Sequence, residues 1–142
     1  MGIHDREHIE IKSSSGFSSW LQKNHATSVG VWVVTFKKKA QVDSPTYEQM
    51  VKIALSFGWI DSIPGRVDEQ RSKLYFSPRK RGSGWSTENK RRIKELLRDG
   101  EMKLPGLKVL QAAKSDGSWS KIDKAESGEI SKDLMTAFRK HA

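Results

Sequence analysis

A basic, glycine-containing loop is the stretch of the sequence best suited to chemistry. It runs Arg79-Lys80-Arg81-Gly82-Ser83-Gly84-Trp85 and follows Pro78, which ends a predicted strand. Two glycines allow the backbone of such a loop to approach a ligand closely. Arginine and lysine bind carboxylates and phosphates through charge-assisted hydrogen bonds. We therefore predict that Arg79, Lys80 and Trp85 line a cleft for a small anionic ligand.

Ser86 and Asn89 lie at the start of the helix predicted after this loop. On a helix they share a face with the apolar residues Ile93, Leu96 and Leu97. The first backbone N–H groups of a helix are unpaired and favour anions. Ser86 and Asn89 are therefore predicted to line the same cleft. The alternative is local: Ser86 caps the helix, and Asn89 bonds a nearby backbone group.

Trp59 and Asp61 follow a predicted helix stop at Gly58 and are candidates for the same cleft. The alternative for Trp59 is packing in the core or at its rim. Asp61 has three interpretations: a structural ion pair with Arg79, a group that orients Arg79 toward an anion, or a catalytic base. The spacing does not choose among them. An enzyme of unknown reaction that uses Asp61 with Arg79 or Ser86 is therefore an alternative function.

Most of the excess positive charge lies in one quarter of the chain. The 142 residues carry 26 basic and 17 acidic side chains, a net charge of +9. Residues 71–108 hold twelve basic and four acidic residues, a net of +8. Such clustering is typical of proteins with anionic partners, although a solvated surface fits it too. Arg91, Lys94 and Arg98, on the outer face of the predicted helix, are the candidate surface for nucleic acid or another polyanion.

Several classes of site are missing from the sequence. Without cysteine, there are no disulfides, thiolate metal sites or cysteine nucleophiles. Ser83 lacks the pattern of a nucleophile elbow, and no Walker-type phosphate loop is present. We expect no metal and no cofactor. No apolar run reaches the roughly 18 residues of a membrane span, and no secretory leader is visible, so a cytoplasmic protein is expected. The oligomeric state is left open.

The elements that position these residues follow from local patterns. Strands are predicted near residues 29–37, 59–63 and 71–77, with a fourth, shorter one at 9–11. The stretch 29–37 is apolar on both faces, which indicates a central strand covered on both sides. Five helices are predicted, in this order: one that ends near Asn24-His25, one between Thr46 and Gly58, one between Ser86 and Gly100, one that begins at Pro105, and one from about Ser131 that carries Leu134, Met135 and Phe138.

These elements predict an α+β fold, with a small, largely antiparallel sheet and helices packed on it. One domain over residues 1–142 is the simplest organisation, since most domains have roughly 100–200 residues. The N-terminal segment at residue 8 is expected to be flexible.

Six motifs occur in a fixed order: Trp20-Leu-x-x-Asn-His25, Val31-Trp-Val-Val-Thr-Phe-Lys37, Thr46-Tyr47, Phe57-Gly-Trp-Ile-Asp61, Tyr75-Phe-Ser-Pro-Arg79 and Trp85-Ser-x-x-Asn89. Together they resemble the YdeI/OmpD-associated family, also called bacteriocin-protection proteins, over roughly residues 9–115. The resemblance implies a bacterial protein linked to tolerance of antimicrobial peptides. It also implies that residues 116–142 are a shortened C-terminal helical segment. Apart from Lys80, the cleft candidates named above lie within the motifs, which favours the cleft hypothesis.

The sequence thus predicts a domain that binds a small anionic or aromatic ligand, or an extended partner, in a cleft at the basic loop. Nonspecific binding of nucleic acid or another polyanion through residues 71–108 is the second hypothesis. The enzyme that uses Asp61 is the third.

Overall fold

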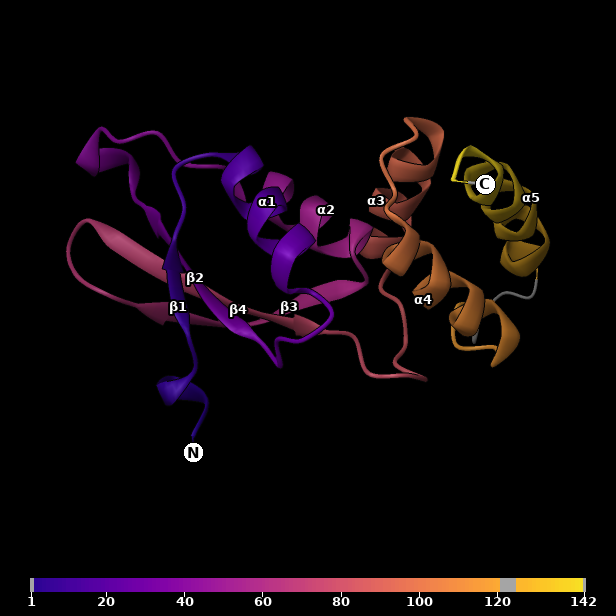
Figure 1. Cartoon of the computed structure of the whole chain (residues 1–142), viewed down its shortest axis with the longest axis horizontal. Coiled ribbons are helices and arrows are strands. Elements are labelled where there is room, and N and C mark those ends of the chain that lie inside the picture. The colour runs from indigo at the N-terminus through magenta and orange to yellow at the C-terminus, as the bar shows by residue number, and fades with distance from the viewer. Residues whose placement is uncertain (1, 121–124, 142) are drawn as a thin grey trace. The chain divides into compact units, whose positions relative to one another are not determined.

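The computed structural model describes residues 2–120 and 125–141, and within them four strands and five α-helices form the fold (Figure 1). In chain order the elements are η1 (Ile3–Asp5), β1 (His8–Glu10), α1 (Ser14–Asn24), β2 (Val31–Phe36), η2 (Lys38–Ala40), α2 (Tyr47–Ser56), β3 (Trp59–Arg66), β4 (Arg71–Pro78), α3 (Thr87–Arg98), α4 (Leu104–Ser115) and α5 (Ala125–Lys140). A four-stranded mixed sheet with helices confirms the predicted α+β class.

Residue contacts divide the chain into two compact units. The first comprises Met1–Ala54 and Trp59–Pro78 and holds the strands β1 to β4. The second comprises Leu55–Gly58 and Arg79–Ala142 and holds α3, α4 and α5. The end of α2 therefore belongs to the second unit. The single domain expected over residues 1–142 stays a prediction.

The sheet of the first unit has the strand order β1-β2-β4-β3. β1 is parallel to β2, whereas β2–β4 and β3–β4 are antiparallel pairs. His8, in the segment expected to be flexible, begins β1 and pairs with Trp32. The strand predicted to end at residue 63 continues to Arg66, with a register shift between Asp61 and Pro64. Proline is tolerated there because β3 is an edge strand and its N–H groups need not all be paired.

Strand β2 forms the middle of the first unit's core. Val31, Trp32 and Val33 are fully buried, as expected for a strand covered on both faces. The strand begins later than the predicted stretch 29–37, and Val29 is 64% exposed. The reason is Gly30, whose φ of 154° interrupts the extended backbone before β2.

Helix α1 packs on one face of this sheet. Phe17 lies against Phe76, with 5.0 Å between ring centroids, and Trp20 meets Trp59 edge-on at 5.9 Å. α1 and α2 lie on the same side of the sheet (Figure 1). Aromatic contacts of this kind add to the stability that apolar burial provides, and they fix the start of β3 against α1.

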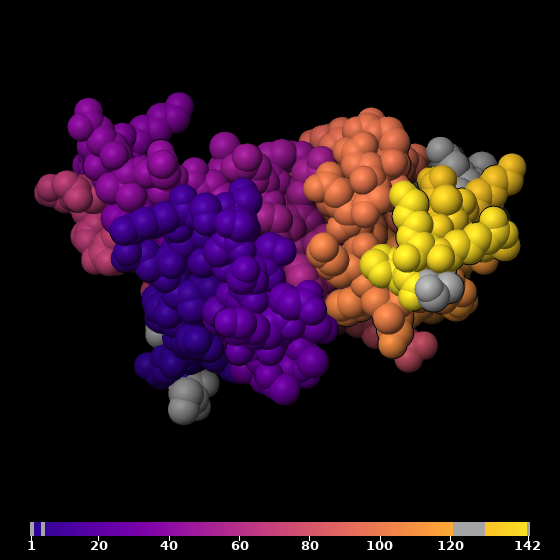
Figure 2. Space-filling model, turned by 45° about the horizontal axis from the view of Figure 1, so that its top comes forward, coloured from indigo at the N-terminus to yellow at the C-terminus, as the bar shows by residue number. Residues whose placement is uncertain are grey.

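The second unit is a group of helices. The buried face of α3 includes Ile93, Leu96 and Leu97, as predicted from their spacing. α5 packs against both α3 and α4. In Figure 2 the yellow surface of α5 lies directly on the orange surface of these two helices.

The C-terminal helix differs from its prediction. It begins at Ala125 rather than near Ser131, because its first turn is polar and gives no apolar periodicity to detect. Its buried face includes Ile130, Leu134 and Ala137, whereas Met135, which the predicted helix also carries, is 59% exposed. None of the described helices is long and apolar enough to cross a lipid bilayer.

Candidate functional site

The basic loop and helix α4 border an open pocket of about 310 Å³ within the second unit, here called the loop pocket. From the loop it is lined by Arg79, Lys80, Arg81, Gly82, Ser83 and Trp85, and from α4 and the turn after it by Lys108, Val109, Ala112, Ala113, Asp116 and Ser118. The volume lies at the lower end of the range for small-molecule sites, roughly 300–1,000 Å³. The pocket is therefore large enough for a small ligand.

Backbone hydrogen bonds hold the loop in its shape. The N–H of Arg79 donates to the carbonyl oxygen of Gly58 (3.1 Å), which ties the loop to the end of α2. The carbonyl oxygen of Lys80 accepts from both the N–H (3.2 Å) and the Oγ hydroxyl (2.8 Å) of Ser83. Gly82 takes a φ of 81° in this turn, a conformation that favours glycine.

Arg79 is held against the ring of Trp85. Its guanidinium carbon lies 3.7 Å from the ring centroid, a cation–π contact. Its Nη2 donates to the carbonyl oxygens of Gly84 (2.9 Å) and Ser83 (3.4 Å). Burial lowers the pKa of Arg79, although the guanidinium stays charged at neutral pH. Nε and Nη1 have no acceptor among the residues that the structure describes, so Arg79 retains hydrogen-bond donors for a ligand.

Trp85 is anchored on the buried side by Trp119. The two ring centroids lie 5.0 Å apart at an interplanar angle of 56°, and Trp119 is fully buried. Lys90 Nζ lies 5.6 Å from the centroid of the Trp119 ring. Trp119 is not predictable as part of this site, because nothing in the local sequence pattern links it to a loop so far away in the chain. This packing makes Trp85 a fixed wall of the loop pocket.

The charges around the loop pocket are strongly unbalanced. Four lining residues are basic, and one, Asp116, is acidic. Lys80, Arg81 and Lys108 have no carboxylate partner within residues 2–120 and 125–141. Asp116 Oδ1 accepts a hydrogen bond from the N–H of Ser118 (2.8 Å). An excess of unpaired cations around a concave surface attracts anions.

Helix α4 supplies a side of the pocket that local sequence patterns do not predict. Lys108, Ala112 and Asp116 follow one another at a spacing of four residues and so lie in one row along the helix. Val109 and Ala113 form the adjacent row. The small side chains of Ala112 and Ala113 leave space that larger ones would fill, but neither carries a chemical group that would mark a site in the sequence.

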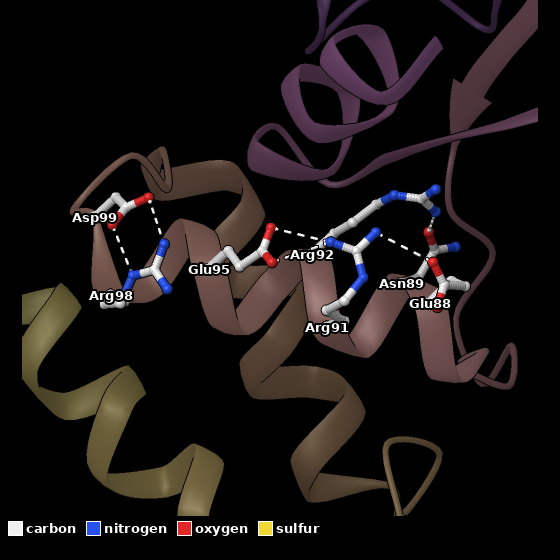
Figure 3. A network of polar contacts seen from close by, with 7 residues as sticks. All are labelled: Glu88, Asn89, Arg91, Arg92, Glu95, Arg98 and Asp99. Atoms are coloured by element: carbon white, nitrogen blue, oxygen red, sulfur yellow. Dashed lines mark hydrogen bonds and ion pairs between the residues drawn. The ribbon is translucent and has the colours of Figure 1, made fainter.

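Ser86 and Asn89, predicted to line the cleft, are engaged locally. Ser86 Oγ accepts a hydrogen bond from the N–H of Asn89 (3.1 Å) and so caps α3. Asn89 Oδ1 accepts from Nη1 of the buried Arg92 (2.8 Å; Figure 3). Neither residue is among those that line the loop pocket. The structure thus agrees with the local alternative for Ser86, while Asn89 bonds a side chain rather than the backbone.

Trp59 and Asp61, the other predicted members of the cleft, belong to the first unit. Trp59 is only 1% exposed and packs on Trp20, as in the packing alternative. Asp61 Oδ2 accepts a hydrogen bond from the hydroxyl of Tyr47 (2.8 Å). These contacts give both residues structural partners within their own unit.

The predicted polyanion surface, Arg91, Lys94 and Arg98, is here called the α3 face. These three residues line a second hollow of about 440 Å³. Arg91 pairs with Glu88 (3.1 Å) and Glu95 (3.0 Å), as Figure 3 shows. Arg98 pairs with Asp99 (2.9 Å), and this carboxylate raises the pKa of the arginine. Much of the positive charge of the α3 face is therefore compensated.

Sequence comparison with known families gives a match over most of the chain. The model of a family described as a domain of unknown function (DUF8412) matches residues 9–109. The matched range includes the whole basic loop and the α3 face, and it stops within α4 just after Lys108 and Val109. No curated protein and no solved structure matches the sequence.

Proposed function

The chain belongs to the DUF8412 family, a domain of unknown function, and we propose that it binds a small anionic ligand in the loop pocket. One observation carries the proposal: four basic side chains surround the cavity, and none of them has a carboxylate partner in the described part of the chain. Unpaired cations close together repel one another, and a bound anion relieves that repulsion. A carboxylate or phosphate is thus the natural occupant.

Arg79 is the central residue of the proposed site. The Trp85 ring and two carbonyl oxygens already order its guanidinium. An ordered side chain loses less conformational entropy on binding than a mobile one, which strengthens the interaction. A partly buried guanidinium also interacts more strongly with an anion than one in bulk water, because screening is weaker there.

The chemistry of the lining residues supports binding rather than catalysis. The pocket has two serines, and both hydroxyls are engaged. Ser83 donates its hydroxyl to the carbonyl oxygen of Lys80, and Ser118 donates its hydroxyl to the carbonyl oxygen of Ala113 (3.4 Å). A serine nucleophile needs an adjacent base, and the described lining residues include no histidine.

Titration with inorganic phosphate, followed by NMR, tests the proposal. We expect Arg79→Ala to weaken phosphate binding at least about tenfold, because losing a charge-assisted hydrogen bond costs roughly 1.5–3 kcal/mol. Arg91→Ala removes the same charge from the α3 face and should leave the affinity nearly unchanged. Equal losses in both variants would show that net charge, and not the loop pocket, determines binding.

Polyanion binding through the α3 face ranks second. The hollow lined by its three basic residues favours it, while the ion pairs of Arg91 and Arg98 oppose it.

We also propose the relationship to YdeI/OmpD-associated proteins, on the strength of the six ordered motifs. A strain that lacks this chain should then become more sensitive to antimicrobial peptides. Unchanged sensitivity would count against the relationship.

A further inference from the structure

We infer that the ligand of the loop pocket is an amphipathic anion, with one carboxylate or phosphate group on a flat apolar body such as an aromatic ring. This inference rests on the proposed function and adds the class of ligand to it. It follows from the uneven distribution of residue types around the cavity.

One side of the loop pocket is cationic. Arg79, Lys80 and Arg81 extend from the loop, and Lys108 faces the same cavity from α4. Positive charge therefore reaches the pocket from two separate segments of the chain. A single anionic group placed there can interact with several of these side chains at once, with Arg79 as the preordered partner.

Helix α4 contributes three apolar residues to the loop pocket. Val109, Ala112 and Ala113 lie on the turns of α4 that begin at Lys108. Their side chains offer no hydrogen-bonding groups, so a polar ligand atom placed against them would lose its water without gaining a partner. The ring of Trp85, which holds the Arg79 guanidinium against one face, also lines the same cavity. An inorganic anion would leave these surfaces uncovered, whereas an aromatic body would cover them.

Lys108 and Asp116 carry opposite charges at the two ends of the row Lys108-Ala112-Asp116, and these charges set the orientation of the ligand. Lys108 and Asp116 are eight residues apart, about 12 Å along a helix that rises 1.5 Å per residue. A carboxylate at the Asp116 end disfavours an anion there. The anionic group therefore lies at the Lys108 end, and the body extends along Ala112.

Two probes of equal charge distinguish the contribution of the anionic group to affinity from that of the apolar body. Phenyl phosphate and methyl phosphate are titrated in turn, with the indole N–H resonance of Trp85 as the readout. A Trp85→Phe variant identifies that resonance among the five tryptophans. We expect phenyl phosphate to bind at least about tenfold more tightly, the scale on which apolar groups are discriminated in a matched pocket. Benzoate and acetate repeat the comparison for a carboxylate.

A variant of the apolar side tests where the body lies. Ala112→Gln fills the space along α4 without changing charge or helix propensity much. It should reduce the affinity for phenyl phosphate to that for methyl phosphate and leave methyl phosphate binding unchanged. Gln111→Ala, at an exposed neighbouring position outside the pocket, is the matched control and should preserve the tenfold preference.

The outcomes distinguish this inference from the proposed function. Equal affinities for phenyl and methyl phosphate would overturn the inference and leave anion binding intact. A preference for phenyl phosphate that survives Ala112→Gln would overturn the placement of the body on α4, and with it the inference. Binding of neither probe, or equally tight binding of the neutral benzyl alcohol, would overturn the proposed function as well.

Discussion

The loop pocket and the α3 face are two cationic surfaces of the same unit with opposite charge arrangements. Around the loop pocket, Lys80, Arg81 and Lys108 lack carboxylate partners within residues 2–120 and 125–141. On the α3 face, Arg91 and Arg98 are paired with carboxylates of their own helix or its C-cap. The comparison teaches that a count of basic residues does not locate a binding site.

The difference arises from spacing in the sequence. Glu88 and Glu95 stand three residues before and four residues after Arg91, and on a helix these distances bring side chains together. The loop has no such periodicity, and the segment Arg79–Trp85 contains no acidic residue. Side chains of the α3 face are therefore compensated locally, whereas those of the loop are available to a partner.

The largest expected effect comes from a substitution that displaces α4. This helix lines the loop pocket but not the hollow of the α3 face, so its displacement should alter one surface and not the other. A Cβ atom at Gly106 would lie 2.2 Å from the carbonyl oxygen of Ser56. That oxygen also accepts a hydrogen bond from the N–H of Lys103 (3.0 Å). We expect Gly106→Ala to lower the free energy of unfolding by about 2–3 kcal/mol, the usual cost of overpacking, as measured by urea denaturation.

A glycine in the basic loop provides the control. A Cβ atom at Gly84 would meet nothing within 4 Å, so Gly84→Ala should change the free energy of unfolding by less than about 0.5 kcal/mol. If Gly106→Ala is as mild as Gly84→Ala, then α4 can move away from the end of α2 and is not a fixed side of the pocket.

Two triple variants with the same loss of charge compare the surfaces as polyanion binders. Lys80, Arg81 and Lys108 are replaced by glutamine in one, and Arg91, Lys94 and Arg98 in the other. Each lowers the net charge by three. We expect the loop variant to elute from heparin at clearly lower salt, because unpaired cations release more counterions on binding than paired ones. Earlier elution of the α3 variant would favour the polyanion hypothesis.

Local patterns predicted the elements of the fold better than the site. The helix predicted between Thr46 and Gly58 is confirmed, and a capping box starts it: the N–H of Thr46 donates to Gln49 Oε1 (2.8 Å), and Thr46 Oγ1 accepts from the N–H of Gln49 (3.1 Å). The cations of the loop could also be read from the sequence. The opposite side of the pocket could not, because Ala112 and Ala113 carry no chemical group that signals a site. Their role depends on packing between segments distant in the chain.

Polar residues at the start of a helix also show that residue type alone does not predict a binding site. Ser86 was a candidate for the cleft, yet its hydroxyl caps α3. Ser86→Ala should lower the free energy of unfolding by about 1 kcal/mol through loss of the cap. Ser86→Asn should restore most of it, since asparagine also caps well, and phosphate binding should persist in both. Loss of phosphate binding in Ser86→Ala at unchanged stability would place Ser86 in the site instead.

The smallest effect concerns the contrast between a paired and an unpaired cation. Arg91 bonds two carboxylates of α3 while remaining 41% exposed, and such pairs contribute about 0.3–0.5 kcal/mol each. Arg91→Gln should therefore lower the free energy of unfolding by up to about 1 kcal/mol at low salt, and by less at high salt because ions screen the pairs. Lys80→Gln removes a cation that has only other cations near it along the loop, so it should leave the free energy of unfolding unchanged or raise it slightly. Urea denaturation of both variants at two salt concentrations measures the contrast. Identical behaviour of the two would mean that the carboxylates of α3 do not compensate their arginines in solution, and the distinction between the α3 face and the loop pocket would then be lost.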